Sequence, residues 1–282
     1  MNTKPATATA LAHPNIAFIK YWGDKDSSLH IPENGSLSMN LDCLYSQTTV
    51  EFDSSLEKDL LTIDGQVPDK NSVHRVHEFL NLVRSLAGIP AFANVTSENN
   101  FPTGSGIASS ASGFAALCMA ASKAAGLELD RRELSRLARR GSGSACRSIP
   151  GGFVEWLRGE DDQSSYAVSI APHNYWDLRD CIAVTSRKHK ETGSTAGHSL
   201  ARSSPLQAVR VKDAESRLDL CRDATLKRDF DAFADIVELD SNLMHAVMMT
   251  SQPRIYYWQP ATLDVMQSVV AWRSSGIPVC FT

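Results

Sequence analysis

Apolar and polar residues alternate in short runs along the first hundred residues, a pattern typical of half-buried strands. Glycine, proline, asparagine or aspartate, which favour turns, bound these runs. One further run of this kind begins at the second glycine of the pair at residues 151–152. The pattern predicts strands over residues 7–12, 47–52, 60–63, 92–96 and 152–156.

Apolar residues at spacings of three and four predict helices, most of them with Asp, Ser or Thr near the start as an N-cap. The predicted helices cover residues 72–87, 109–125, 130–139, 213–227, 230–249 and 262–274. Strands dominate the first hundred residues and helices the last seventy. This order favours an α+β chain of two lobes, with a boundary near residues 171–176. We therefore expect one domain over residues 1–172 and a second over residues 173–282.

Composition and charge narrow the class of protein. Of the 282 residues, 43% are hydrophobic and 21% are charged, which is typical of a globular chain that buries a core. The net charge of −4 provides no basic field for nucleic acid. Six scattered cysteines without CxxC or Cys/His spacing indicate reduced thiols and a cytoplasmic protein. No apolar run reaches the roughly 18 residues that a membrane span needs.

A glycine and serine turn, "PTGSG", leads directly into the predicted helix that begins at Ser109. Gly104 and Gly106 permit close backbone approach to a ligand, and the helix start offers unpaired amides to an anion. The hydroxyls of Ser109 and Ser110 suit phosphate oxygens or magnesium. This pattern predicts a phosphate-chain site, although it matches neither GxxxxGK[ST] nor GxGxxG. The alternative is a turn that feeds a tightly packed alanine and serine helix.

Two other stretches carry candidate chemistry. In "ARRGSGSACRS", small residues and hydroxyls precede Arg147, whose guanidinium suits a carboxylate or a phosphate. The alternative for this stretch is a helix end with solvated arginines. In "NIAFIKYWG", Lys20 and Tyr21 follow an apolar segment. A lysine in this position is often a surface residue whose stem packs on apolar neighbours.

Taken together, the motifs resemble the diphosphomevalonate decarboxylase family of the GHMP kinase superfamily. The resemblance rests on "NIAFIKYWG", "NGSLSMNLD", "NNFPTGSGIASSASGFAAL", "ARRGSGSACRSIPGGFVEW" and "DSNLMHA", and it runs from about Ala8 to the last residue. "KYWG" together with "GSGSACRS" separates this family from mevalonate and homoserine kinases, which share the glycine turn but not these two motifs.

The resemblance implies a two-lobe GHMP kinase fold, α+β in both lobes with a helix-rich C-terminal lobe, usually as a homodimer. It also implies an enzyme that uses ATP and magnesium to phosphorylate the tertiary 3-hydroxyl of a 5-phosphorylated mevalonate. Loss of phosphate and CO2 then gives an alkene. Phosphorylation makes the hydroxyl a good leaving group, and loss of CO2 quenches the positive charge that develops as it departs.

The resemblance implies roles for individual residues. Gly104, Ser105 and Gly106 would hold the phosphates of ATP. Ser109 and Ser110 would serve phosphate and magnesium, and Ser109 also counts among the expected catalytic groups.

Arg147 would orient the substrate carboxylate, and Lys20 would steady the transferring phosphoryl group. The positions matching those that the family uses around the substrate and its 5-phosphate are Tyr21, Arg75, Ser142 and Ser144. Residues 186–195 match a family loop that closes over ATP. Within this loop Ser194 is the first candidate for ATP binding, and Lys188 is the second.

Two departures from the family pattern change the expectations. Most of the family reads "KYWGK", with the second lysine on the substrate diphosphate, whereas Asp24 stands here. A carboxylate repels a diphosphate, which favours 5-phosphomevalonate as the substrate and isopentenyl phosphate as the product. The alternative is that Lys25 reaches into the same place.

The second departure is at the end of the chain, where "VCFT" aligns with the residues just before the family's catalytic aspartate. That aspartate would lie about two residues past Thr282, so we expect a truncated C-terminal strand, low stability and little turnover. Three hypotheses therefore stay open: an ATP-dependent decarboxylase, a mevalonate 3-kinase that stops at phosphorylation, and a noncatalytic binder of ATP or substrate.

Overall fold

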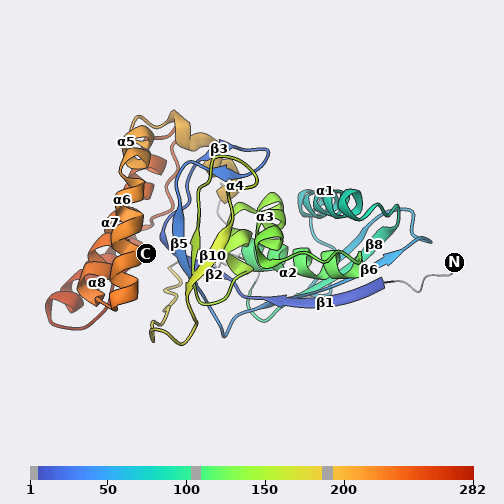
Figure 1. The fold of residues 1–282 in the computed structure, drawn as a ribbon. Coiled ribbons are helices and arrows are strands. Elements are labelled where there is room, and N and C mark those ends of the chain that lie inside the picture. The colour runs from blue at the N-terminus through green and yellow to red at the C-terminus, as the bar shows by residue number, and fades with distance from the viewer. Residues whose placement is uncertain (1–5, 103–108, 186–192) are drawn as a thin grey trace. The chain divides into compact units, whose positions relative to one another are not determined.

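The computed structural model describes residues 6–102, 109–185 and 193–282. Figure 1 shows the course of the chain. The chain forms two compact units, each assembled from segments that are distant in sequence. Unit 1 comprises Met1–Ile16, Asn40–Gly151 and Tyr166–Val168, and unit 2 comprises Ala17–Met39, Gly152–Ser165 and Ser169–Thr282. The predicted domain boundary after residue 172 stays a prediction.

Unit 1 is built on a four-stranded sheet in the order β1-β6-β8-β7. Its strands are β1 (Ala6–Ala12), β6 (Ser46–Asp53), β7 (Leu60–Ile63) and β8 (Phe92–Asn99). Strand β6 pairs antiparallel with β1 and β8, whereas β7 runs parallel to β8. Every second residue of β6 and β8 is buried, so one face of the sheet carries the core.

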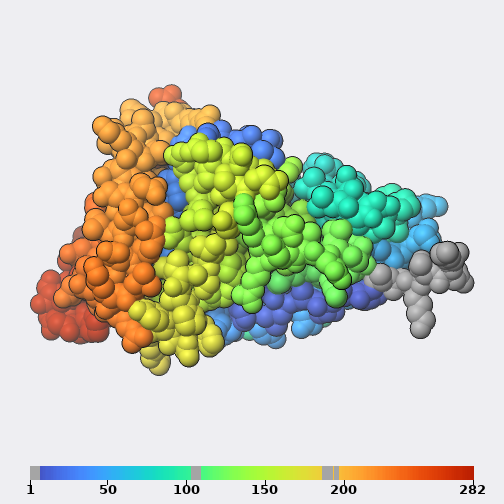
Figure 2. All heavy atoms as spheres, viewed as in Figure 1, coloured from blue at the N-terminus to red at the C-terminus, as the bar shows by residue number. Residues whose placement is uncertain are grey.

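Helices cover that face of the sheet (Figure 1). They are α1 (Lys70–Ala87), α2 (Ser109–Ala124) and α3 (Arg131–Gly141), followed by the 3-10 helix η1 (Gly143–Ser148). Helix α2 consists mainly of alanine and serine, which let it pack closely on β1 and β6. The segment from α2 to α3, green in Figure 2, reaches the surface on the face drawn.

Local sequence explains where the helices of unit 1 begin and end. The Asp69 carboxylate accepts from the backbone N–H groups of the first turn of α1, and Gly88 ends this helix with a positive φ of 65°. Asp130 and Glu133 form a capping box at the start of α3. Between sheet and helices lies the core, whose largest members include Val50, Phe52, Phe79, Leu80, Val83, Val95, Phe114 and Leu117.

A second four-stranded sheet, most of whose residues belong to unit 2, has the order β10-β9-β5-β2, and β3 pairs with β4. These strands are β2 (Asn15–Ile19), β3 (Asp24–Asp26), β4 (Ile31–Pro32), β5 (Ser36–Asn40), β9 (Phe153–Trp156) and β10 (Ala167–Ala171). Strands β5 and β9 are antiparallel, and β9 is buried along its whole length.

The other regular elements described in unit 2 are helices. Its helices are α4 (Ser194–Leu200), the 3-10 helix η2 (Ala201–Ser203), α5 (Gln207–Lys212), α6 (Ala214–Lys227), α7 (Phe230–Thr250) and α8 (Pro260–Ser274). Helices α6 and α7 pack together, because Arg228 in the left-handed conformation ends α6 and Asp229 immediately caps α7.

The structure confirms all five predicted strands, as β1, β6, β7, β8 and β9, and all six predicted helices, as α1, α2, α3, α6, α7 and α8. The pattern missed β2, β3, β4, β5, β10, α4 and α5. None of the helices in the described ranges is long and apolar enough to cross a membrane. Within those ranges, no cluster of three or more His, Cys, Asp or Glu side chains is placed to hold a metal ion.

Candidate active site

The first turn of α2 presents the predicted hydroxyls of unit 1. Ser109 is half-buried and Ser110 is exposed, and no acidic residue lies in this turn. The positive end of the helix dipole is therefore not neutralised by a neighbouring carboxylate of the same turn. Gly104, Ser105 and Gly106, which precede this turn, lie outside the described residues.

A cavity of about 160 Å³ opens beside this turn within unit 1. Ser109, Ser110 and Gly113 of α2 line one side of it. Its remaining lining residues come from the sheet and from α1 and α2, namely Thr48, Leu61, Ile63, Ser72, Arg75, Val76, Val95, Ser97, Asn99, Phe114 and Leu117. The cavity thus combines an apolar floor with hydroxyl, amide and guanidinium groups at its edge, as small-molecule sites commonly do.

Arg75, on α1, is the only cation among the residues lining this cavity in the described structure. Its Nη2 donates to the Gly141 carbonyl at 3.0 Å, and its guanidinium lies 4.8 Å from the centre of the Phe114 ring. Burial lowers the pKa of Arg75 from its ordinary value. The group is nevertheless protonated at neutral pH, so it presents a positive charge to the cavity.

Arg147 lies in η1 and is 3% exposed. Its Nε donates to Asn15 Oδ1 at 3.1 Å. The Asn15 amide is itself fixed, because Nδ2 donates to the Ser148 hydroxyl at 2.8 Å and to the Ser144 carbonyl at 3.2 Å. The guanidinium is therefore held in a buried position rather than solvated.

The other predicted residues of this stretch flank the same 3-10 helix. Ser142 is buried at the junction between α3 and η1, where its carbonyl accepts from the Ala145 N–H at 2.8 Å. Ser144, one turn before Arg147, is half-buried. The small residues after α3 let the chain turn sharply, so that Arg147 is buried only six positions after the helix ends.

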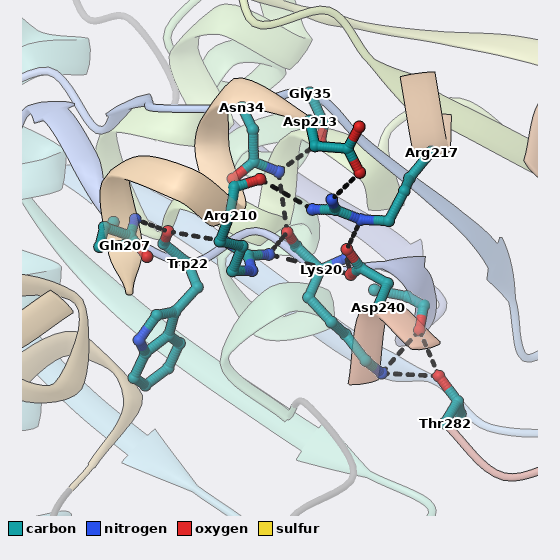
Figure 3. Close-up of polar contacts among 12 residues, drawn as sticks. Lys20, Trp22, Asn34, Gly35, Gln207, Arg210, Asp213, Arg217, Asp240 and Thr282 are labelled. Atoms are coloured by element: carbon teal, nitrogen blue, oxygen red, sulfur yellow. Dashed lines mark hydrogen bonds and ion pairs between the residues drawn. The ribbon is translucent and has the colours of Figure 1, made fainter. Parts of the chain in front are cut away.

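Lys20 belongs to unit 2 and follows the last residue of β2. Its Nζ donates to the Ala17 carbonyl and to the Thr282 hydroxyl, both at 2.7 Å. Its backbone N–H donates to Asp240 Oδ2 at 2.7 Å, and its carbonyl accepts from Arg210 Nη2 at 2.8 Å (Figure 3). Lys20 is thus fixed through both its side chain and its peptide groups.

Tyr21 and Asp24 form a second polar group of unit 2. The Tyr21 hydroxyl donates to Asp24 Oδ1, and His30 Nδ1 lies 3.8 Å from Asp24 Oδ2. The ring of His198 stacks on Tyr21 with ring centres 4.0 Å apart. Burial raises the pKa of Asp24, but the interactions with His30, Tyr21 and His198 outweigh it, so the pKa lies below its ordinary value. Asp24 is therefore ionised at neutral pH.

Lys25 follows Asp24 in β3, whose pairing with β4 is irregular between Asp24 and Asp26. Its Nζ contacts the Glu160 carboxylate, and its side chain is 44% exposed. The Lys25 ammonium is thus paired with Glu160.

The remaining predictions concern the loop before α4. Ser194 is the first residue of α4, and its side chain lies outside the described part of the structure. Lys188 also lies outside it. Sequence reasoning did not identify Asn15, His198 or Arg210 as neighbours of the candidate residues. Asn15 was within the quoted "NIAFIKYWG" motif, whereas nothing in the local pattern around Arg210 points to Lys20.

The fold and these two groups of residues define a class of enzyme with the GHMP kinase fold. The structure resembles that of MDDEF in complex with MVAPP, AMPPCP and magnesium, with a TM-score of 0.92 and 38% sequence identity over 99% of this chain and 86% of that chain. Two family descriptions match consecutive parts of the sequence. The diphosphomevalonate decarboxylase-like N-terminal domain matches residues 12–167, and the mevalonate 5-diphosphate decarboxylase C-terminal domain matches residues 181–282. The chain belongs to the diphosphomevalonate decarboxylase family.

Curated relatives agree with this assignment. The diphosphomevalonate decarboxylase of Ganoderma lucidum is 41% identical over 96% of this chain and 72% of its own length. The phosphomevalonate decarboxylase of Haloferax volcanii is 36% identical over 98% of this chain and 84% of its own length. The predicted family, fold class and decarboxylase enzyme class are confirmed, and the predicted ATP and magnesium agree with the AMPPCP and magnesium in the similar structure.

Proposed function

We propose that this chain is an ATP-dependent decarboxylase of 5-phosphorylated mevalonate. The main observation behind this proposal is the buried guanidinium of Arg147, whose Nε donates to Asn15. This contact is evidence from the structure that is independent of the family match. An immobilised fork of N–H donors suits the bidentate recognition of a carboxylate.

Unit 1 would bind the nucleotide. The Ser109 and Ser110 hydroxyls and the positive end of α2 suit phosphate oxygens and a magnesium ion, which would neutralise the charge on the phosphates. Gly104, Ser105 and Gly106 are the proposed cradle for the phosphate chain, and Ser194 and Lys188 are proposed as further ATP contacts. The adjoining cavity, with its apolar floor of Leu61, Ile63 and Val76, supports a small-molecule site next to these hydroxyls.

The proposed reaction has two steps, phosphoryl transfer and then loss of phosphate and CO2. The substrate 3-hydroxyl oxygen attacks the terminal phosphorus of ATP, its proton passes to solvent, and the bond between this phosphorus and ADP breaks so that ADP leaves. The C3–O bond then breaks with release of phosphate, and the C1–C2 bond breaks to release CO2 and form the C2=C3 double bond. Lys20 would stabilise the transferring phosphoryl group and Arg147 would hold the carboxylate. Tyr21, Arg75, Ser142 and Ser144 are proposed around the substrate and its 5-phosphate.

The experiment that tests this proposal measures ADP and CO2 separately with mevalonate, its 5-phosphate and its 5-diphosphate. Equal amounts of ADP and CO2 support the decarboxylase. ADP without CO2 would identify a 3-kinase, and binding of AMPPCP without ADP release would identify a noncatalytic binder. Either of these two results contradicts the proposal.

We further propose that the monophosphate is the preferred substrate. Asp24 is an ionised carboxylate at the Tyr21 hydroxyl, and Lys25 is turned toward Glu160, which disfavours the alternative that Lys25 replaces the family lysine. A negative charge at this place opposes the second phosphate of a diphosphate. The Haloferax volcanii relative is named for the monophosphate.

Replacing Asp24 with lysine tests this preference. The ratio of kcat/KM for diphosphate over monophosphate should rise at least about tenfold in Asp24→Lys, corresponding to ~1.4 kcal/mol. Glu160→Gln is the matched control, because it releases Lys25 without changing the charge at Asp24. An unchanged ratio in Asp24→Lys, or the same rise in Glu160→Gln, would contradict the assignment of specificity to Asp24.

A further inference from the structure

Three helices of unit 2 bring buried charges together behind the peptide groups of Lys20 (Figure 3). Arg210 comes from α5, Arg217 from α6 and Asp240 from α7. Their side chains are 1%, 2% and 0% exposed. Arg217 Nε donates to Asp240 Oδ1 at 2.9 Å, and Arg210 Nη2 lies 3.8 Å from Asp240 Oδ2.

Arg210 and Asp240 make direct contact with the backbone on either side of Lys20. Asp240 accepts from the Lys20 N–H at 2.7 Å. Arg210 donates to the Lys20 carbonyl at 2.8 Å and to the Trp22 carbonyl at 3.3 Å. Asn34 completes the arrangement, since its Nδ2 donates to the Lys20 carbonyl at 3.0 Å and its Oδ1 accepts from Arg210 at 3.2 Å.

Arg217 has the same burial but a different set of contacts. It donates to Asp240, to Asp213 Oδ2 at 2.8 Å and to the Arg210 carbonyl at 2.9 Å. Each of these bonds ends on the helices rather than on the segment from Lys20 to Trp22. Arg217 therefore supports the two groups that hold the segment, whereas Arg210 holds it directly.

Stability alone is a poor reason for this cluster. Removing two guanidinium groups from water is unfavourable, and apolar residues of similar size often stabilise a core equally well. Burial lowers the pKa of Arg210 despite the nearby Asp240, and the buried Arg210 Nε has no hydrogen-bond partner among the described residues. The bonds that the cluster does make fix the direction of one short stretch of backbone.

We propose that Arg210 and Asp240 are positioning residues for Lys20, holding its peptide groups so that its side chain projects in one direction. This inference rests on the proposed function, in which Lys20 acts on the transferring phosphoryl group. A lysine that stabilises a transition state must be placed accurately, because a displacement of about 1 Å can cost roughly 100-fold in rate. Arg210 and Asp240 would affect turnover only through Lys20, without touching the substrate.

The experiment compares two equally buried arginines. Arg210→Lys keeps a positive charge near Asp240 but loses the fork that reaches two carbonyls, so kcat should fall roughly 100-fold with little change in KM. Arg217→Lys should lower the melting temperature similarly but reduce kcat much less. Arg222→Lys, in a bidentate pair with Glu155 elsewhere in unit 2, should retain wild-type kcat.

Hydrogen exchange of the peptide covering residues 17–23 provides a readout that does not need turnover. Exchange should be faster in Arg210→Lys and Asp240→Asn than in wild type, and unchanged in Arg222→Lys. If Arg210→Lys does not fold, Asn34→Ala removes one bond to the Lys20 carbonyl and one acceptor of Arg210, which keeps its bonds to the two carbonyls. This variant should show a smaller loss of kcat and a smaller rise in exchange than Arg210→Lys.

Two outcomes would overturn the positioning role: equal losses of kcat in Arg210→Lys and Arg217→Lys, or unchanged exchange over residues 17–23 in both Arg210→Lys and Asp240→Asn. A wild-type protein without turnover would instead contradict the proposed function. In that case the exchange measurement alone decides whether the cluster holds the segment.

Discussion

Asn15 fixes the direction of the Arg147 guanidinium, because the asparagine amide is held by Ser148 and Ser144. Arg147→Lys keeps the charge but loses the planar fork, so kcat/KM should fall about 100-fold. Asn15→Ala should lower kcat/KM less, and it should also destabilise the fold by ~1–3 kcal/mol, since buried polar partners lose their bonds. Steady-state kinetics and thermal melting check both expectations, and an Arg147→Lys variant with wild-type kcat/KM would contradict the role of Arg147.

The six thiols should differ in reactivity because burial disfavours the thiolate. Burial raises the pKa of Cys146 to about 12 and that of Cys280 to about 11, and it raises the pKa values of Cys118 and Cys221. The exposed thiols are Cys43 and Cys181. Iodoacetamide at pH 8 should therefore modify these two first, as mass spectrometry can show.

The pH dependence of alkylation provides the control. Below its pKa, the thiolate fraction of Cys280 rises about tenfold per pH unit, so its alkylation should accelerate between pH 8 and pH 10. Cys146 should stay protected over the same range, and all six thiols should react in urea. Rapid modification of Cys146 in the folded protein at pH 8 would contradict its burial.

At the scale of the element, the end of α3 depends on a glycine. A Cβ at Gly141 would lie 2.2 Å from a Phe114 ring atom and 2.9 Å from Phe79. Gly141→Ala should therefore destabilise the protein by ~1–3 kcal/mol through overpacking. Gly113 of α2 is the matched control, because a Cβ there meets nothing within 4 Å and alanine favours a helix. Urea denaturation of both variants tests this, and equal stabilities would contradict the packing.

The sequence pattern missed several elements for related physical reasons. Strand β5 buries Ser36 and Ser38 as well as its apolar residues. Its polar residues therefore do not mark an exposed face, and alternation of polar and apolar residues does not report burial there. Strand β2 is a short apolar run with the same ambiguity. Helices α4 and α5 are too short for a helical period to appear. By contrast, α1 and α3 have capping residues that can be identified from sequence alone.

At the scale of the whole molecule, nucleotide binding should stabilise the native state. With AMPPCP and magnesium at 100 times the dissociation constant, the gain is ~2.7 kcal/mol. The melting temperature should rise by several degrees, and ADP with magnesium should act in the same direction. Ser109→Ala combined with Ser110→Ala should reduce the shift, and no shift in wild type at saturating nucleotide would contradict a nucleotide site in unit 1.

The candidate site was predictable where its residues lie in short motifs. The hydroxyls of α2, Arg75 and Arg147 could be named from sequence, and the structure places Ser109, Ser110 and Arg75 around one cavity. Asp240 lies in the quoted "DSNLMHA" motif, but neither its contact with Lys20 nor that of Arg210 could be predicted in this way. Arg210 and Asp240 lie 190 and 220 positions from Lys20 along the chain, and no local pattern encodes a contact over that separation.

That separation also affects the order of events during synthesis. During synthesis, Lys20 is made 190 residues before Arg210 and 220 residues before Asp240. Until then the nascent lysine has none of these partners, and its backbone samples many conformations. A partly translated chain can thus assemble the segments of unit 1 before the backbone of Lys20 gains these partners, so the proposed activity would appear only after α5 and α7 have folded.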